Sequence, residues 1–113
     1  MVLVHGSIVD ARRTWRHQFE LAKRWTLVVM DEGPSWEADV PLDALARAPF
    51  RTLVLSGGHS PAFEAVHSPA FEAVCDAIAE RLHAERDTIA GRGHTIPSTG
   101  AQYNARLEAF LRA

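Results

Sequence analysis

Four short apolar runs constrain the fold of this chain more than any other feature. They span residues 2–5, 25–30, 51–56 and 88–90, and a turn or loop follows each of them. Segments with helical spacing separate the runs. Strands that alternate with helices are typical of a parallel sheet with helices on both faces. We therefore expect an α/β fold, with a small parallel sheet of about four strands flanked by helices, in a single domain over residues 1–113.

The segments between and after these runs carry distinct helix signals. Asp10 suits an N-cap, and apolar residues recur after it at helical spacing: Trp15, Phe19, Leu21 and Ala22. A short helix is expected over 42–48, where Pro49 ends it. After a loop over 91–98, an amphipathic helix is expected over 102–111. Its inner side should carry Tyr103, Leu107, Phe110 and Leu111.

An octapeptide occurs twice in succession between the third and fourth runs. Residues 59–66 read His-Ser-Pro-Ala-Phe-Glu-Ala-Val, and residues 67–74 repeat them without a change. The two copies cannot be equivalent within one helix, because an interior proline removes a hydrogen bond and clashes with the preceding turn, at about 3 kcal/mol. Ser-Pro is favourable at a helix start. We therefore expect the long helix to begin at Ser68-Pro69 and to end near Leu82.

Length, charge and cysteine content bear on the classes of function. A chain of 113 residues suits one domain with a modest core. Its net charge of -2 offers no electrostatic basis for binding nucleic acid or an anionic membrane. Cys75 is the only cysteine, so no disulfide can form within the chain. We expect Cys75 to lie on the long helix and to be a small residue of the hydrophobic core. No membrane span or signal peptide is recognisable, so a cytoplasmic location is expected.

Motifs near the two ends of the chain point to a known family. Met1–Ser7 is an apolar strand that runs into His-Gly, and Gly91–His94 reads Gly-Arg-Gly-His just before the terminal helix. These motifs, together with Ala48–Pro61, resemble segments of bacterial α/β-hydrolases. The resemblance implies that His94 corresponds to the catalytic base, and that Gly6 and Ser7 belong to the oxyanion loop.

The resemblance also implies a shortened fold. The central strands of the family and its nucleophile elbow have no counterpart in this chain, and the two matching pieces join near Met30 to Glu32. If the first run then pairs with the third, the sheet has the strand order 2-1-3-4. The expected architecture is therefore a reduced α/β-hydrolase core.

The family's nucleophile motif, Gly-x-Ser-x-Gly, is absent. Its best imitation is Gly-His-Ser-Pro-Ala, centred on Ser60, between a predicted strand and a helix. The residue after the nucleophile must donate its backbone N–H to the oxyanion, but Pro61 has none. Loss of one such donor costs about 10²–10³ in rate. Ser60 is therefore a poor candidate nucleophile, and a capping or turn role is favoured for it and for Ser68, which Pro69 follows.

The other groups of a catalytic site are also incomplete in the sequence. Family members can carry the acid after the strand that corresponds to the third run, but this chain has Gly-Gly-His-Ser there. Asp31, at the end of the second run, is therefore a candidate acid. Ser7 could approach His94 if their strands are neighbours, although a hydroxyl that satisfies loop backbone groups is the simpler interpretation. No ligand spacing such as His-Glu-x-x-His occurs, so we expect no metal and no cofactor.

Two hypotheses about function follow. The first is a protein related to α/β-hydrolases with weak or no esterase activity, whose substrate, if it is active, is a small ester-like molecule. The second is a non-catalytic α/β module that associates with itself, as in a homodimer, because the missing central strands would leave sheet edges unpaired and apolar faces uncovered. Neither hypothesis includes a nucleic-acid or membrane partner. The missing nucleophile motif favours the second.

Overall fold

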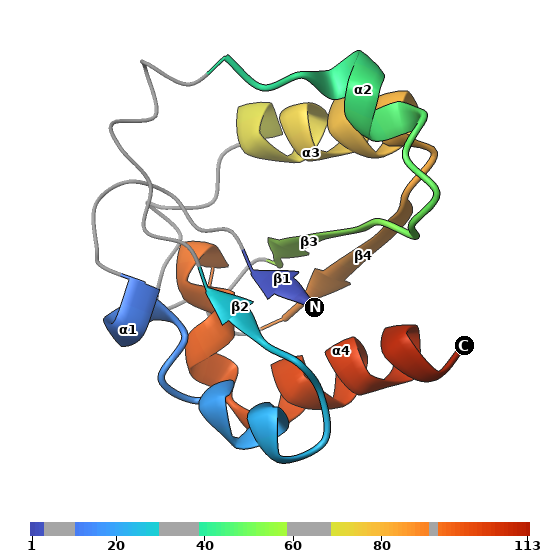
Figure 1. The fold of residues 1–113 in the computed structure, drawn as a ribbon. Coiled ribbons are helices and arrows are strands. Elements are labelled where there is room, and N and C mark those ends of the chain that lie inside the picture. Colours follow the sequence, from blue (N-terminus) through green and yellow to red (C-terminus); the bar gives the residue numbers. More distant parts are fainter. Residues whose placement is uncertain (4–10, 30–38, 59–68, 91–92) are drawn as a thin grey trace. The chain divides into compact units, whose positions relative to one another are not determined.

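The computed structural model describes residues 1–3, 11–29, 39–58, 69–90 and 93–113. These residues form helices and parallel strands, in agreement with the predicted α/β class (Figure 1). They group into two compact units, Met1–Asp39 with Pro97–Ala113 and Val40–Ile96. Each unit contains one two-stranded parallel sheet. None of the helices within these ranges is long and apolar enough to cross a membrane.

The first unit contains the two N-terminal strands. β1 (Val2–Leu3) and β2 (Val28–Val29) pair in parallel. Met1 holds the start of this pair, because its ammonium donates to the backbone oxygen of Thr26 at 2.7 Å and its carbonyl accepts from the N–H of Val28 at 2.9 Å. Val28 is 46% exposed. The prediction of a buried strand over 25–30 is therefore wrong at Val28, and β2 begins three residues later than predicted.

The segment after Asp10 is helical, but it is not one continuous helix. α1 (Ala11–Thr14) is followed by a turn and then by the 3-10 helix η1 (Phe19–Lys23). The N–H of Gln18 donates to the oxygen of Trp15, three residues earlier, at 2.9 Å. Bonds of this spacing tighten the chain to about three residues per turn. The change of helix type alters which side chains face the core.

The core of the first unit joins these N-terminal helices to α4 (Ala101–Arg112). The ring centroids of Trp15 and Tyr103 lie 6.1 Å apart. The nearly fully buried apolar side chains of this unit are Trp15, Leu21, Tyr103 and Leu107. Phe19, in contrast, is 42% exposed, so its predicted place on the buried face is wrong. Four of the eight residues on the two predicted faces are thus nearly fully buried. Phe110 and Leu111 are half-buried, and Ala22 is exposed like Phe19.

The 3-10 helix η4 (Gly93–Thr99) occupies most of the segment that the sequence predicts as a loop. A turn at Gly100 then leads into α4, one residue before the predicted start. Gly100 has φ 61° and ψ -103°, a conformation that side chains with a Cβ rarely adopt. Its N–H donates to the oxygen of Pro97 at 3.2 Å, and its oxygen accepts from Asn104 at 2.9 Å. Backbone bonds at Gly100 therefore join η4 to α4.

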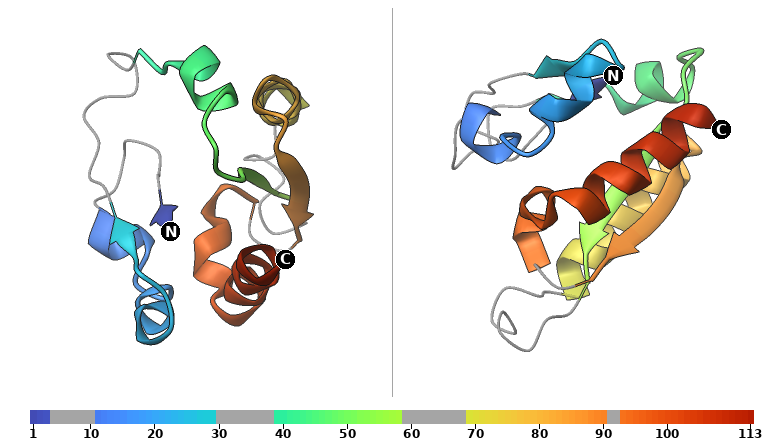
Figure 2. Two further views of the ribbon diagram at one scale, coloured as in Figure 1. Left: turned by 45° about the vertical axis from the view of Figure 1, so that its right-hand side comes forward. Right: turned by 90° about the horizontal axis from the view of Figure 1, so that it is seen from below.

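The second unit is built on a longer pair of parallel strands. β3 (Leu53–Gly57) pairs along its whole length with β4 (Glu85–Ile89). α3 (Pro69–Leu82) lies along this pair, and α2 (Leu42–Ala46) packs against α3 (Figures 1 and 2). β4 begins at Glu85 rather than at Thr88, because the backbone pairs with β3 while its charged side chains find ionic partners.

The start of α3 confirms the prediction from the tandem octapeptide. The helix begins at Pro69, and it ends at Leu82 as expected. Proline suits the first position because the N–H of that residue makes no hydrogen bond within the helix. The first copy of the octapeptide lies outside the described residues. Cys75 is half-buried on α3, so its predicted place in the core is only partly correct.

Two of the three predicted strand neighbours are present. β1 pairs with β2, and β3 pairs with β4, all in parallel. A pairing of β1 with β3 is not among the strand pairs of the described residues. The complete order 2-1-3-4 therefore stays a prediction.

The end of α3 places a residue other than glycine in the left-handed region. His83 has φ 51°. Its N–H donates to the oxygen of Glu80 at 3.2 Å, and the N–H of Ala84 donates to that of Ala79 at 2.9 Å, which is the bond pattern of a Schellman motif. Glycine is the usual residue at this position, because a Cβ in the left-handed region costs about 1 kcal/mol or more.

We expect His83→Gly to raise the free energy of unfolding by up to about 1 kcal/mol, because it removes the strained Cβ at the end of α3. Chemical denaturation followed by circular dichroism measures the change. His83→Ala is the matched control: it also removes the imidazole, but it keeps the Cβ and should give no such gain. A glycine variant less stable than the alanine variant would contradict the role of backbone strain here.

Candidate functional site

The predicted catalytic groups fall largely outside the described part of the chain. Gly6, Ser7, Asp31 and Ser60 lie in segments that the structure does not describe. The backbone of His94 belongs to η4, but its side chain is also outside the description. The catalytic roles of these five residues therefore stay predictions from the sequence.

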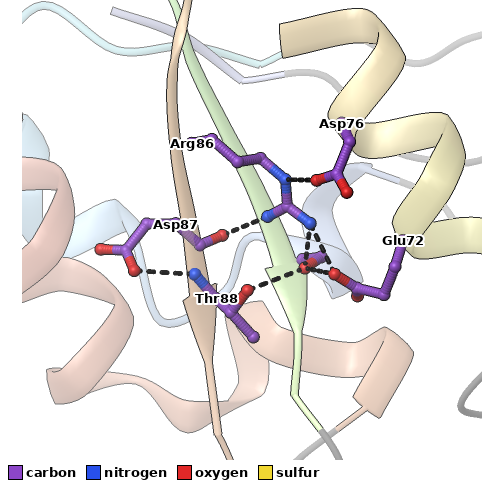
Figure 3. A network of polar contacts seen from close by, with 6 residues as sticks. Glu72, Asp76, Arg86, Asp87 and Thr88 are labelled. Atoms are coloured by element: carbon purple, nitrogen blue, oxygen red, sulfur yellow. Dashed lines mark hydrogen bonds and ion pairs between the residues drawn. The ribbon is translucent and has the colours of Figure 1, made fainter.

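A cluster of charged and polar side chains lies between α3 and the β3–β4 pair. Figure 3 shows the guanidinium of Arg86 reaching from β4 toward Glu72 and Asp76 on α3. The two carboxylates are four residues apart, so they lie on one face of the helix. On the sheet, the register places Ser56 of β3 opposite Thr88 of β4. The helix and both strands thus contribute side chains to a single cluster.

Arg86 donates from all three of its guanidinium nitrogens. Nε donates to Oδ1 of Asp76 at 3.0 Å, and Nη1 donates to the backbone oxygen of Asp87 at 2.5 Å. Nη2 donates to Oε2 of Glu72 at 2.6 Å and to Oγ of Ser56 at 2.9 Å. The side chains of Arg86 and Glu72 are 20% and 29% exposed, whereas that of Asp76 is 67% exposed. Glu72 is therefore the stronger ionic partner, since water screens exposed pairs.

The hydroxyl of Ser56 is fully engaged in this cluster. Ser56 is 8% exposed; its Oγ donates to Glu72 at 3.0 Å and accepts from Arg86. A nucleophilic serine needs a neighbouring base that can take its proton. Glu72 is already neutralised by Arg86, and the described contacts of the cluster include no imidazole. The arrangement therefore fixes a helix to two strands and does not activate the serine.

Cys75 lies on α3 close to the same charges. Burial raises the pKa of its thiol; the positive charge of Arg86 opposes this shift, and Glu72 and Asp76 add to it. The thiolate, which is the nucleophilic form of cysteine, is therefore disfavoured at neutral pH. Cys75 is thus poorly suited to nucleophilic chemistry or metal binding.

A second, uncharged cluster is buried in the first unit. Gln18 and Asn104 are 0% and 5% exposed. Nε2 of Gln18 donates to Oδ1 of Asn104 at 2.9 Å and to the backbone oxygen of Pro97 at 3.1 Å. Nδ2 of Asn104 donates to the backbone oxygen of His17 at 2.8 Å and to Oε1 of Glu20 at 2.7 Å. These amides tie α4 to the N-terminal helices.

Sequence reasoning missed both polar clusters. A weak signal existed for the amides, because Gln18 and Asn104 each lie three residues from a buried apolar side chain, Leu21 and Leu107. No comparable signal marked Arg86, which stands in a charged stretch that reads as solvent-exposed. Among the residues that the structure describes, no group of three or more His, Cys, Asp or Glu side chains is arranged to hold a metal ion.

Comparison with known proteins assigns no family to the chain. No protein-family model, no curated protein and no solved structure matches it. The resemblance to α/β-hydrolases therefore rests on the sequence motifs alone.

We expect Arg86→Met to lower the free energy of unfolding by about 1–3 kcal/mol, because it leaves the half-buried Glu72 and the buried Ser56 without their charged donor. Urea denaturation measures the loss. Arg51→Met is the matched control, since Arg51 forms an exposed pair with Glu85 on the same sheet and should cost less than about 1 kcal/mol. Equal losses in the two variants would show that the Arg86 cluster contributes no more than a surface ion pair.

Among the described residues of the first unit, Tyr103 has a large pKa shift. Burial against the core raises the pKa of its phenol to about 12, from an ordinary value of about 10. Below pH 10 the phenol keeps its proton in both the folded and the unfolded chain, so the protonated, buried phenol makes its full contribution to stability. Between about pH 10 and 12 only the unfolded chain loses this proton, so stability falls as pH rises, by about 3 kcal/mol in total.

Because Tyr103 is the only tyrosine, the absorbance of tyrosinate reports this titration directly. We expect a midpoint near pH 12 in the folded protein and near pH 10 in denaturant. Tyr103→Phe should remove this contribution to the alkaline loss of stability. A folded-state midpoint near pH 10 would show that the phenol is not buried.

Proposed function

We propose that the chain is a reduced relative of α/β-hydrolases that acts as a self-associating, non-catalytic α/β module. The observation that carries the proposal is the size of its sheets, because each parallel sheet among the described residues has two strands. Parallel sheets normally have several strands and are covered on both faces. Two strands by themselves are marginally stable. Such pairs therefore favour the addition of further strands.

A join of β1 to β3 would satisfy part of this demand. It would produce the predicted order 2-1-3-4, with β2 and β4 at the edges. An edge strand presents unpaired backbone groups to a second chain. Val28 of β2 adds an apolar side chain that is 46% exposed. The proposed partner is therefore a second copy of this chain, in a homodimer that extends the sheet.

Exposed apolar side chains support the same proposal. Large exposed apolar residues of the described part are 42–60% exposed, and they comprise Phe19, Val28, Val40, Phe50, Phe71 and Val74. Single residues of this kind are common on protein surfaces. Here they accompany short open sheets, which makes association more favourable.

The sequence and the described polar cluster both support a non-catalytic role. The chain has no Gly-x-Ser-x-Gly, and Pro61 follows the best replacement, Ser60. Ser56 is committed to Glu72 and Arg86. The hydroxyl of Ser56, within β3, is thus a structural group.

Residual esterase activity is the second candidate function, and the position of His94 favours it. The backbone of His94 lies five residues beyond the end of β4, in η4, and α4 follows. This order of strand, histidine and terminal helix is the one that the α/β-hydrolase resemblance implies for a general base. Gly6 and Ser7 would supply the oxyanion loop, with Asp31 as the acid and a small ester as substrate.

Light scattering over a range of concentrations tests the association. We expect a mass that rises from monomer to dimer, and we expect Val28→Lys to weaken the dimer because a charge on an edge strand opposes pairing. Val40→Lys is the matched control, since Val40 is 55% exposed and lies outside the strands. A clean monomer at high concentration, or equal effects of the two lysines, would rule out this mode of association.

The same preparations distinguish the second candidate. A fluorophosphonate probe and a short-chain ester should give neither labelling nor turnover if the module is non-catalytic. Labelling or turnover that disappears in His94→Ala would instead establish residual esterase activity and overturn the non-catalytic part of the proposal.

A further inference from the structure

The second unit has a hollow at the end of its sheet where both strands begin. Its volume is about 390 Å³, and residues from the segment that joins α2 to β3 and from the segment that joins α3 to β4 line it. β3 and β4 are parallel and begin here, at Leu53 and Glu85. Ser60 and His94 follow the other ends of these strands in sequence. The residues that line the hollow include none of those predicted for an esterase site.

The lining of the hollow combines an apolar wall with an ion pair. Phe50, Ala48 and Leu82 supply the apolar part, and Arg51 and Glu85 supply opposite charges. Phe50 is 59% exposed although it is aromatic, so its ring is available to a molecule in the hollow. An aromatic or aliphatic body would cover this ring and remove apolar surface from water.

The ion pair shows where a carboxylate can be held. Nη2 of Arg51 donates to Oε1 of Glu85. The two side chains are 47% and 45% exposed, so the pair is weak and can exchange with a carboxylate from solution. A guanidinium can bind a carboxylate through two parallel hydrogen bonds, and the contact of Nη2 with Oε1 of Glu85 marks where one carboxylate oxygen is held.

We propose that this hollow binds a small aromatic carboxylate. Arg51 holds the carboxylate in exchange with Glu85, and Phe50 and Leu82 contact the ring. His83, just after the end of α3, also lines the hollow. The site requires no metal and no group from the predicted hydrolase site.

Benzoate is the probe, and amide chemical shifts followed by NMR are the readout. We expect millimolar benzoate to shift the amides around Arg51, His83 and Glu85 in a saturable way. Benzylamine has the same ring with the opposite charge, and it should leave these amides unchanged at equal concentration. Equal shifts with both molecules would overturn the assignment of Arg51 as the recognising group.

Two variants at the ion pair give opposite expected effects. Arg51→Gln should weaken benzoate binding tenfold or more, on the order expected for the loss of a charged hydrogen-bond donor. Glu85→Gln removes the competing internal carboxylate and should tighten binding by about two- to fivefold, the worth of an exposed ion pair. Phe50→Ala should weaken binding without changing the preference for benzoate over benzylamine.

Arg47→Gln is the matched control for charge, because Arg47 is exposed on the same connection but does not line the hollow. Its affinity for benzoate should equal that of the wild type. The proposal is overturned if benzoate shifts no amides, if the shifts are spread over both units, or if Glu85→Gln weakens binding. A folded Glu85→Gln variant keeps the test valid should Arg51→Gln be unstable.

Discussion

The packing of the helix and strands in the second unit depends on the hydrogen bonds that the guanidinium of Arg86 donates. Arg86 stands on β4 and bonds to Glu72 on α3 and to Ser56 on β3. The nearly fully buried apolar residues described in this unit are few: Ala79, Ile89 and Ile96. A small apolar core fixes a helix to two strands weakly, because burial contributes in proportion to apolar area. The partly buried hydrogen bonds of Arg86 therefore help to fix the position of α3 on the two strands.

The first unit meets the same constraint with neutral groups. Gln18 and Asn104 bridge helices from the two ends of the chain, and the rings of Trp15 and Tyr103 pack nearby. The NH₂ groups of both amides find acceptors, and these bonds favour one arrangement of the helices, although Oε1 of Gln18 is buried without a partner. In the described part of each unit, the buried polar side chains of these clusters are committed to structural contacts, which is consistent with the proposed non-catalytic role.

Local chemistry explains the successful predictions from sequence. Pro69 marks the start of α3 because a proline suits the first turn of a helix and no later one. Apolar spacing located α4 within one residue at either end. The predicted start of β4 is three residues too late, because its first residues are charged and do not form an apolar run. Pairing with β3 satisfies their backbone groups whatever the side chains are. The exposure of Phe19 was missed because bonds around Gln18 tighten the local helix. The catalytic residues predicted from the family resemblance fall outside the described side chains, so the structure leaves them as predictions.

By itself, the sequence determined the α/β class, the start of α3 and the lack of a nucleophile motif, since each depends on neighbouring residues or on a short pattern. Only the tertiary structure decided which polar side chains are buried and with what partners. Gln18 and Asn104 are 86 residues apart, and Arg86 finds its carboxylate on a helix that precedes it. Such pairs depend on how distant elements pack, and spacing along a single chain does not encode that packing in any local pattern.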